Sequence, residues 1–187
     1  MKKTYVIVDF EATCSEDNEL PRSEMEIIEF GAVAVDGKSL KPLGEFQEFV
    51  QPVRNTQLTE FCQELTSILQ TDVDNAYQFS PVLERFTVWL RKFDEPVFCS
   101  WGSYDKKQLL LDCEYHNVEY PFNEEHINLK NEFSKRQRLK QRFGMKKALA
   151  KAQLSLDGRH HRGIDDARNM VKLMPYIVGD AKIVRGK

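Results

Sequence analysis

The sequence lacks the features that mark a secreted, disulfide-bonded or membrane-spanning protein. Its four cysteines, Cys14, Cys62, Cys99 and Cys113, are scattered singly and form no CxxC pair. This usage is typical of free thiols in a reduced compartment, not of a disulfide framework. The chain also contains no apolar run of membrane-spanning length and no N-terminal signal pattern. We therefore expect a soluble, cytoplasmic protein that does not interact with a membrane.

Linker-like segments, internal repeats and low-complexity tracts are also absent from the sequence. A chain of 187 residues, of which 41% are hydrophobic, is long enough to bury one sizeable core. We therefore expect residues 1–187 to form a single domain. The oligomeric state is not specified by any pattern in the sequence.

The net charge is small, but the charges are unevenly distributed. The chain carries 27 basic and 29 acidic residues, which gives a net charge of −2. The basic stretch from Lys130 to Lys151 contains nine basic residues and one acidic residue, so it carries +8 and the remaining sequence carries −10. Such a stretch is either a solvated helix face or a binding surface for a polyanion such as nucleic acid.

The spacing of apolar residues predicts a mixed α/β fold. Segments with strand character are 4–10, 26–36, 45–52 and 96–101. Segments with helical periodicity are 57–69, 80–93, 103–115 and 164–174. The basic stretch is also expected to be helical, in two pieces broken near Gly144. Short connections between the first three strands favour an antiparallel meander, followed by strand–helix alternation, in a mixed central sheet flanked by helices.

Two carboxylates directly follow a β-branched run at the end of the first predicted strand. In the segment VIVDFEATC, Asp9 and Glu11 are two positions apart, so both side chains point to the same face of the strand. Like charges held this close repel each other, and desolvation adds to the cost. Asp105 follows the last predicted strand, and Asp166 lies in the first turn of the last helix. Each of these two, taken alone, is explained as an acid that complements a helix dipole.

Four carboxylates that can converge at one edge of a sheet require cations to neutralise them. Oxygen ligands without a cysteine cage are typical of sites for hard divalent ions. The sequence therefore predicts a Mg²⁺ site, in which Mn²⁺ can substitute.

Three segments resemble the sequence motifs of a nuclease family. DFEATC (9–14), WGSYD (101–105) and HHRGIDDARN (160–169) are similar, in order and separation, to the three motifs of the DEDDh 3′–5′ exonucleases. The segment QLTEFCQELTSILQTDVDNA (57–76) resembles the Eri-type branch, which includes the histone-mRNA 3′ exonucleases and the KapD-like proteins. The resemblance covers nearly the whole chain and implies a ribonuclease-H-like fold.

The resemblance also implies roles for individual residues. The implied ligands of two Mg²⁺ ions are Asp9, Glu11, Asp105 and Asp166. The implied catalytic residues are Glu11 and His161, of which His161 is the general base. The implied contacts of the terminal nucleotide are Glu11, Ala12 and His161. The family spacing selects His161 over His160 and Asp166 over Asp165.

Aromatic residues near the motifs are candidates for stacking on nucleic-acid bases, which holds a single strand without reading its sequence. Trp101 and Tyr104, close to Asp105, are either stacking surfaces or core residues, and we include Trp101 among the expected substrate contacts. For Phe30 and Met145 the expectation is core packing.

The expected function is the metal-dependent 3′–5′ hydrolysis of single-stranded RNA or DNA with a free 3′ end, with RNA or short oligonucleotides preferred. In a two-metal site, one ion lowers the pKa of a bound water and the other stabilises the departing oxygen. An imidazole of ordinary pKa, such as that of His161, can act as a base at neutral pH. The expected products are nucleoside 5′-monophosphates.

Three alternatives remain from the sequence. They are a DNA-directed 3′–5′ exonuclease, a non-catalytic nucleic-acid-binding module and an endonuclease of the same broad fold. The presence of all four acids disfavours the non-catalytic module. The histidine five residues before Asp166 disfavours the endonuclease.

Single alanine variants of the four acids are expected to lose turnover while the fold stays intact. Because each substitution removes one of several repelling charges, the melting temperature of the metal-free protein should not fall. Hydrolysis of end-labelled RNA with Mg²⁺ and a thermal melt followed by circular dichroism measure the two effects. Near-normal rates in any two variants would contradict the metal-site assignment. The substitutions are to be made singly at Asp9, Glu11, Asp105 and Asp166.

Overall fold

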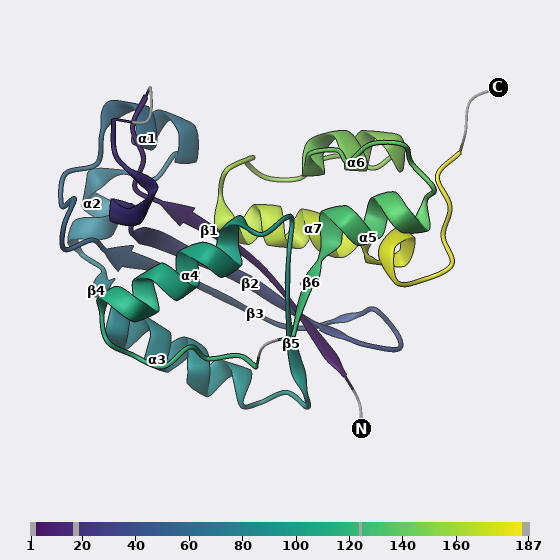
Figure 1. The fold of residues 1–187 in the computed structure, drawn as a ribbon, viewed down its shortest axis with the longest axis horizontal. Helices are drawn as coiled ribbons and strands as arrows, with labels where there is room; N and C mark the ends of the chain where they lie inside the picture. The colour runs from purple at the N-terminus through teal and green to yellow at the C-terminus, as the bar shows by residue number, and fades with distance from the viewer. Residues whose placement is uncertain (1–2, 17–18, 124, 185–187) are drawn as a thin grey trace.

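The structure is a computed structural model, and it describes residues 3–16, 19–123 and 125–184 (Figure 1). Within these residues the strands form one six-stranded sheet in the order β4-β3-β2-β1-β5-β6. The strands are β1 Thr4–Ala12, β2 Ile27–Asp36, β3 Pro42–Gln51, β4 Tyr77–Gln78, β5 Pro96–Ser100 and β6 His126–Asn128. β1 therefore lies inside the sheet, where its ladder hydrogen bonds are made on both sides.

The pairing of the strands confirms the predicted mixed sheet. β1 pairs antiparallel with β2, and β2 pairs antiparallel with β3, as expected for the meander. β5 joins β1 in parallel, and β6 joins β5 in parallel. β4 and β6 were not predicted, because strands of two and three residues are too short to show a periodic pattern.

Helices cover both faces of the sheet, as predicted (Figure 1). The α-helices are α1 Glu60–Thr66, α2 Gln70–Asp74, α3 Phe79–Leu90, α4 Tyr104–Tyr115, α5 Leu129–Arg136, α6 Met145–Lys151 and α7 Gly163–Ile177, and a short 3-10 helix spans Arg22–Glu24. α3 and α4 pack on the face that carries Val6, Val8 and Phe10 of β1. α5, α6 and α7 pack on the opposite face, which carries Ile7. No helix among the described residues is long and apolar enough to cross a membrane.

The structure corrects one helix prediction and confirms another. The helix expected at 57–69 is shorter and spans only α1, because Ser67 adopts a left-handed conformation with φ of 58° and ends the helix. The short helix α2, which follows at Gln70, was not predicted. The turn allows Ile68 to enter the core, where its side chain is fully buried. The basic stretch does form two helices, α5 and α6, and Gly144 is the N-cap of the second.

The first turn of α7 lies directly against the centre of the sheet. A Cβ atom at Gly31 of β2 would lie 2.1 Å from the carbonyl carbon of Gly163. A Cβ atom at Gly163 would lie 2.7 Å from the backbone oxygen of Asp9. These separations are too short for any side chain, so the two glycines are what allow the helix to begin here. The contact brings the acidic first turn of α7 to the end of β1.

Candidate active site

The residues predicted from the sequence line one cavity of about 360 Å³. The predicted residues on its wall are Asp9, Glu11, Ala12, Trp101, Asp105, His161 and Asp166. They come from β1, from the β5–α4 connection with the first turn of α4, and from the loop before α7 with its first turn, three regions that are distant in sequence. The other lining residues are Phe10, Cys14, Leu65, Tyr104, Gly144, Met145 and His160.

Three of the four predicted ligand acids form a compact group. One carboxylate oxygen from each of Asp9, Glu11 and Asp166 lies within 4.8 Å of the others. Asp9 and Glu11 extend the face of β1 that carries Ile7, and this is the face on which α7 packs. Asp105 lines the same cavity, but its Oδ1 accepts a hydrogen bond from the backbone N–H of Phe10 at 3.1 Å. Asp105, on α4, is therefore held against β1, the strand that carries Asp9 and Glu11.

Burial and mutual repulsion oppose ionisation of Asp9, Glu11 and Asp105. Desolvation, followed by the charge of Asp105, raises the pKa of Asp9 well above its usual value. Desolvation, followed by the charge of Asp166, raises the pKa of Glu11 to about 9. Desolvation also raises the pKa of Asp105 to about 6, and the hydrogen bond from Phe10 counteracts this effect. Without a cation, Glu11 is therefore largely protonated at neutral pH, and ionisation of Asp9 is opposed in the same way.

The donor set fits a divalent metal ion. Asp9, Glu11 and Asp166 offer only carboxylate oxygens, which are the ligands that Mg²⁺ and Mn²⁺ prefer. The raised pKa values of Asp9 and Glu11 show that, among the described residues, no nearby positive charge compensates for the burial and repulsion of their ionised carboxylates. A bound cation would remove this penalty, so the acidic cluster is well suited to hold one.

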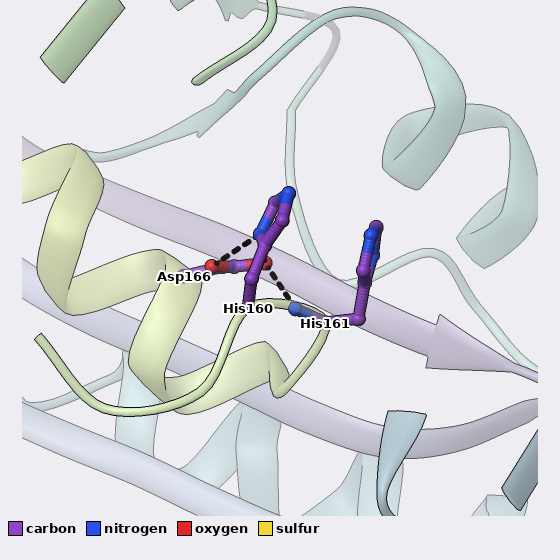
Figure 2. Close-up of side chains that lie close together, drawn as sticks. All are labelled: His160, His161 and Asp166. Carbon is purple, nitrogen blue, oxygen red and sulfur yellow. Dashed lines mark hydrogen bonds and ion pairs between the residues drawn. The ribbon is translucent and has the colours of Figure 1, made fainter. Parts of the chain in front are cut away.

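The two histidines before α7 have different contacts with Asp166 (Figure 2). The Nδ1 atom of His160 lies 3.0 Å from Oδ2 of Asp166, and the backbone N–H of His161 donates to the same oxygen at 2.9 Å. The two rings are stacked, with centroids 4.0 Å apart. The sequence did not predict the contact between His160 and Asp166, because only the loop conformation aims that ring at the carboxylate.

The ring of His161 is the one that is suited to accept a proton. Desolvation and then the neighbouring His160 lower the pKa of His161 below its usual value, so the ring is neutral at pH 7. Its backbone has a positive φ of 64°, and the backbone N–H is occupied by Asp166 while the side chain lines the cavity. The conformation thus gives the two stacked rings different contacts: the ring of His160 contacts the Asp166 carboxylate, whereas His161 contacts it through its backbone N–H.

Asp165 is directed to contacts outside the site. Its Oδ2 accepts the backbone N–H of Arg159 at 2.9 Å, and its Oδ1 forms an ion pair with Arg168 at 3.2 Å. Asp165 is not among the residues that line the cavity, whereas Asp166 is. The geometry agrees with the choice of Asp166 as the candidate ligand.

Glu29 of β2 stabilises the position of α7 next to the site, and the sequence analysis did not single it out. It lies opposite Glu11 in the β1–β2 register and is fully buried. Its Oε2 accepts the backbone N–H of Gly163 at 3.0 Å and the Nε–H of Arg162 at 3.1 Å. These bonds hold the start of α7 on the sheet. The signal in the sequence was an acid inside an otherwise apolar strand.

The aromatic candidates separate into core and cavity residues. Phe30 is fully buried, which confirms the core prediction, and Met145 is buried while also lining the cavity. The Nε1–H of Trp101 donates to the backbone oxygen of Phe143 at 3.0 Å, so this ring is held in place on the cavity wall. Tyr104 also lines the cavity and is 37% exposed.

A face of α1 contributes to the cavity, which the sequence analysis did not foresee. Leu65 lines the cavity although it lies far from the three motifs in sequence, and it is 38% exposed. Cys14 lines the cavity and Cys62 is buried in α1, and both are free thiols, as are Cys99 and Cys113.

Comparison with known proteins connects this geometry to one family. The model of the RNase T-type exonuclease family matches residues 6–174. The chain is 33% identical to human 3′-5′ exoribonuclease 1 over 183 residues, which cover 93% of this chain and 52% of that protein. The chain therefore spans about half the length of the curated relatives it matches first.

Two solved structures of 3′-exonucleases share the fold. A structure that describes 3′-end-specific recognition of a histone mRNA stem-loop superimposes with a TM-score of 0.87 at 31% identity, covering 95% of this chain and 64% of the other. The nuclease domain of 3′hExo bound to rAMP, described as a DEDDh family member, superimposes with a TM-score of 0.83 at 32% identity, covering 94% of this chain and 91% of the other. The expected ribonuclease-H-like fold is thereby confirmed.

The raised pKa of Glu11 predicts how the stability of the metal-free protein changes with pH. Between the ordinary pKa of 4.5 and the folded value of about 9, the folded state binds more protons than the unfolded state. The contribution of Glu11 to the free energy of unfolding therefore falls as pH rises through this window. In EDTA, the melting temperature of the wild-type protein, taken relative to that of Glu11→Gln, should fall between pH 6 and pH 8. Mg²⁺ should raise the wild-type melting temperature more at pH 8 than at pH 6, as differential scanning fluorimetry would measure. The same Mg²⁺ effect in Glu11→Gln would contradict the assignment.

Proposed function

Because the chain belongs to the RNase T-type exonuclease family, in its DEDDh class, we propose that it is a metal-dependent 3′–5′ exonuclease. The proposed substrate is single-stranded RNA or a short oligonucleotide with a free 3′ end, and the proposed products are nucleoside 5′-monophosphates. The observation that carries the proposal is the grouping of Asp9, Glu11 and Asp166 within 4.8 Å on the wall of a cavity that also contains His161. An acidic cluster alone is common, but an acidic cluster beside a neutral imidazole matches the requirements of phosphodiester hydrolysis.

The proposed metal ligands are carboxylates from three segments of the chain. Asp9, Glu11 and Asp166 would hold two Mg²⁺ ions together with Asp105, and Mn²⁺ can substitute. When bound, the ions supply activation of the attacking water and stabilisation of the departing oxygen. The carboxylates also keep the local charge balanced, because four negative charges oppose the four positive charges of two divalent ions.

The protein groups perform the remaining tasks of the reaction. His161 accepts the proton of the attacking water at its ring nitrogen, which its lowered pKa leaves unprotonated at pH 7. His160 and the backbone N–H of His161 keep the Asp166 carboxylate oriented. Trp101 and Leu65, both on the cavity wall, provide apolar surface for the terminal base, and Glu11 and Ala12, which line the same cavity, contact the sugar.

The preference for RNA is supported by the relatives, since the human protein at 33% identity is a 3′-5′ exoribonuclease. DNA-directed exonuclease activity is the second candidate function. Apolar contacts with the base, such as those proposed for Trp101 and Leu65, do not report the 2′-OH that distinguishes RNA from DNA.

Parallel digestion of matched RNA and DNA strands tests the proposed function. We expect 5′-end-labelled RNA to shorten stepwise from its 3′ end with Mg²⁺ or Mn²⁺, to resist digestion in EDTA, and to be degraded faster than DNA of the same sequence. A strand with a blocked 3′ end is the control, and it should stay intact. Internal cleavage of that strand would instead indicate an endonuclease.

Alanine substitution separates the roles of the two histidines. His161→Ala should lower kcat by roughly 10²–10⁴-fold, the usual contribution of a positioned general base. His160→Ala should lose less activity, because His160 supports Asp166 and contacts no reacting atom in this mechanism. Mg²⁺-induced thermal stabilisation should persist in His161→Ala, which shows that the metal site is intact. A larger loss in His160→Ala than in His161→Ala would reverse the assignment.

A further inference from the structure

A second cavity lies outside the candidate active site and is lined by cations. It has a volume of about 630 Å³ and lies between the end of α5 and the C-terminal segment. The cations on its wall are Lys135, Arg136, Arg138 and Lys182, and the remaining lining residues are Gln137 and Ile183. We refer to it as the basic hollow. All four cationic residues are exposed, so the hollow presents positive charge to solvent.

One acidic side chain offsets part of this charge. Asp180 forms an ion pair with Arg136 at 3.3 Å, and the guanidinium of Arg136 also donates to the backbone oxygen of Gly179 at 2.9 Å. Arg136 therefore attaches the C-terminal segment to α5. Lys182 adds a long contact, since its Nζ lies 3.5 Å from the backbone oxygen of Arg136. Lys135 and Lys182 are both exposed and present their charge to solvent.

The basic hollow and the catalytic cavity are joined by one short segment of chain. Arg138 lines the hollow, and Gly144 lines the catalytic cavity. Between them, Lys140 and Arg142 are exposed to solvent. The linking segment 138–144 thus carries cations along the surface from one cavity to the other.

The separation of the two cavities is set by α7. From Asp166 to Ile177 the helix spans about 16 Å, at a rise of 1.5 Å per residue. Gly179, which Arg136 contacts, lies just beyond the end of this helix. Figure 1 shows α5 beside α7, with the C-terminal segment leaving α7 near the end of α5. The basic hollow is therefore at the opposite end of α7 from the acidic cluster.

We propose that the segment 138–144 and the basic hollow form a track that binds the phosphodiester backbone of single-stranded nucleic acid upstream of its 3′ end. The proposal rests on the proposed function, since the 3′ end must occupy the catalytic cavity. A stacked strand advances about 3.4 Å per nucleotide, so the hollow is reached roughly five nucleotides from the scissile bond. Lysine and arginine hold phosphates without reading bases, which allows the strand to advance after each cleavage.

A triple variant, Lys135→Gln/Lys140→Gln/Lys182→Gln, removes charge from the hollow and the linking segment and leaves Arg136 in place. The matched control is Lys38→Gln/Lys41→Gln/Lys92→Gln, which removes the same charge from exposed positions that line neither cavity. KM with Mg²⁺ is measured for oligonucleotides of 2, 4, 6 and 12 nucleotides. Binding of a fluorescent 12-mer is measured by anisotropy in EDTA at several salt concentrations.

The track variant should raise KM for the 12-mer roughly 10- to 100-fold, and the increase should shrink steeply below about five nucleotides. The slope of log affinity against log salt should become shallower by about 2, because each phosphate contact on a single strand contributes about 0.7. The control variant should follow the wild type at every length. An equal increase at all lengths, an equal effect in the control or no effect would overturn the track.

The two readouts distinguish failure of the track from failure of the proposed function. The anisotropy measurement does not depend on hydrolysis, so a selective loss of 12-mer binding supports the track even in a protein that cleaves nothing. Conversely, cleavage of the 12-mer by the wild type together with unchanged KM and binding in the triple variant would remove the track and leave the exonuclease function standing.

Discussion

The arrangement of the site depends on the close contact between the first turn of α7 and the sheet. Gly31 and Gly163 approach so closely that a Cβ atom at either position would collide with backbone. The contact is reinforced by Glu29, whose buried carboxylate accepts the N–H of Gly163 and pairs with Arg162. Because Asp166 lies one turn into this helix, its carboxylate is delivered to the end of β1. A helix held further from the sheet would leave the acids apart.

The same contact produces an electrostatic penalty. Asp9 and Glu11 already lie side by side on β1, and the approach of α7 adds a third acid, in a group where Glu11 and Asp166 are buried. The resulting rise in the pKa of Asp9 and Glu11 means that the metal-free protein keeps protons where a cation would bind. The fold therefore tolerates a destabilised arrangement that divalent ions relieve, which is common at functional sites.

The basic stretch illustrates how one segment can serve two regions. Its first helix, α5, ends beside the C-terminal segment, where Arg136 contacts Gly179. Its second helix, α6, begins at Gly144 and Met145, which lie on the wall of the catalytic cavity. The break between the two helices is what allows a single run of cations to extend from the far end of α7 to the site.

Local patterns in the sequence were sufficient to predict the mixed sheet and the main helices, and the resemblance to the family motifs supplied the four acids and His161 of the cavity. The alternation of a strand places Asp9 and Glu11 on one face whatever surrounds them, and the motif spacing distinguished Asp166 from Asp165. Tertiary structure alone decided the contacts that join distant segments. No local pattern could show that Glu29 would hold the start of α7, that Leu65 of α1 would line the cavity, or that His160 would contact Asp166. Periodicity reports which face of an element is buried, whereas the partner across that face is chosen by packing of the whole chain.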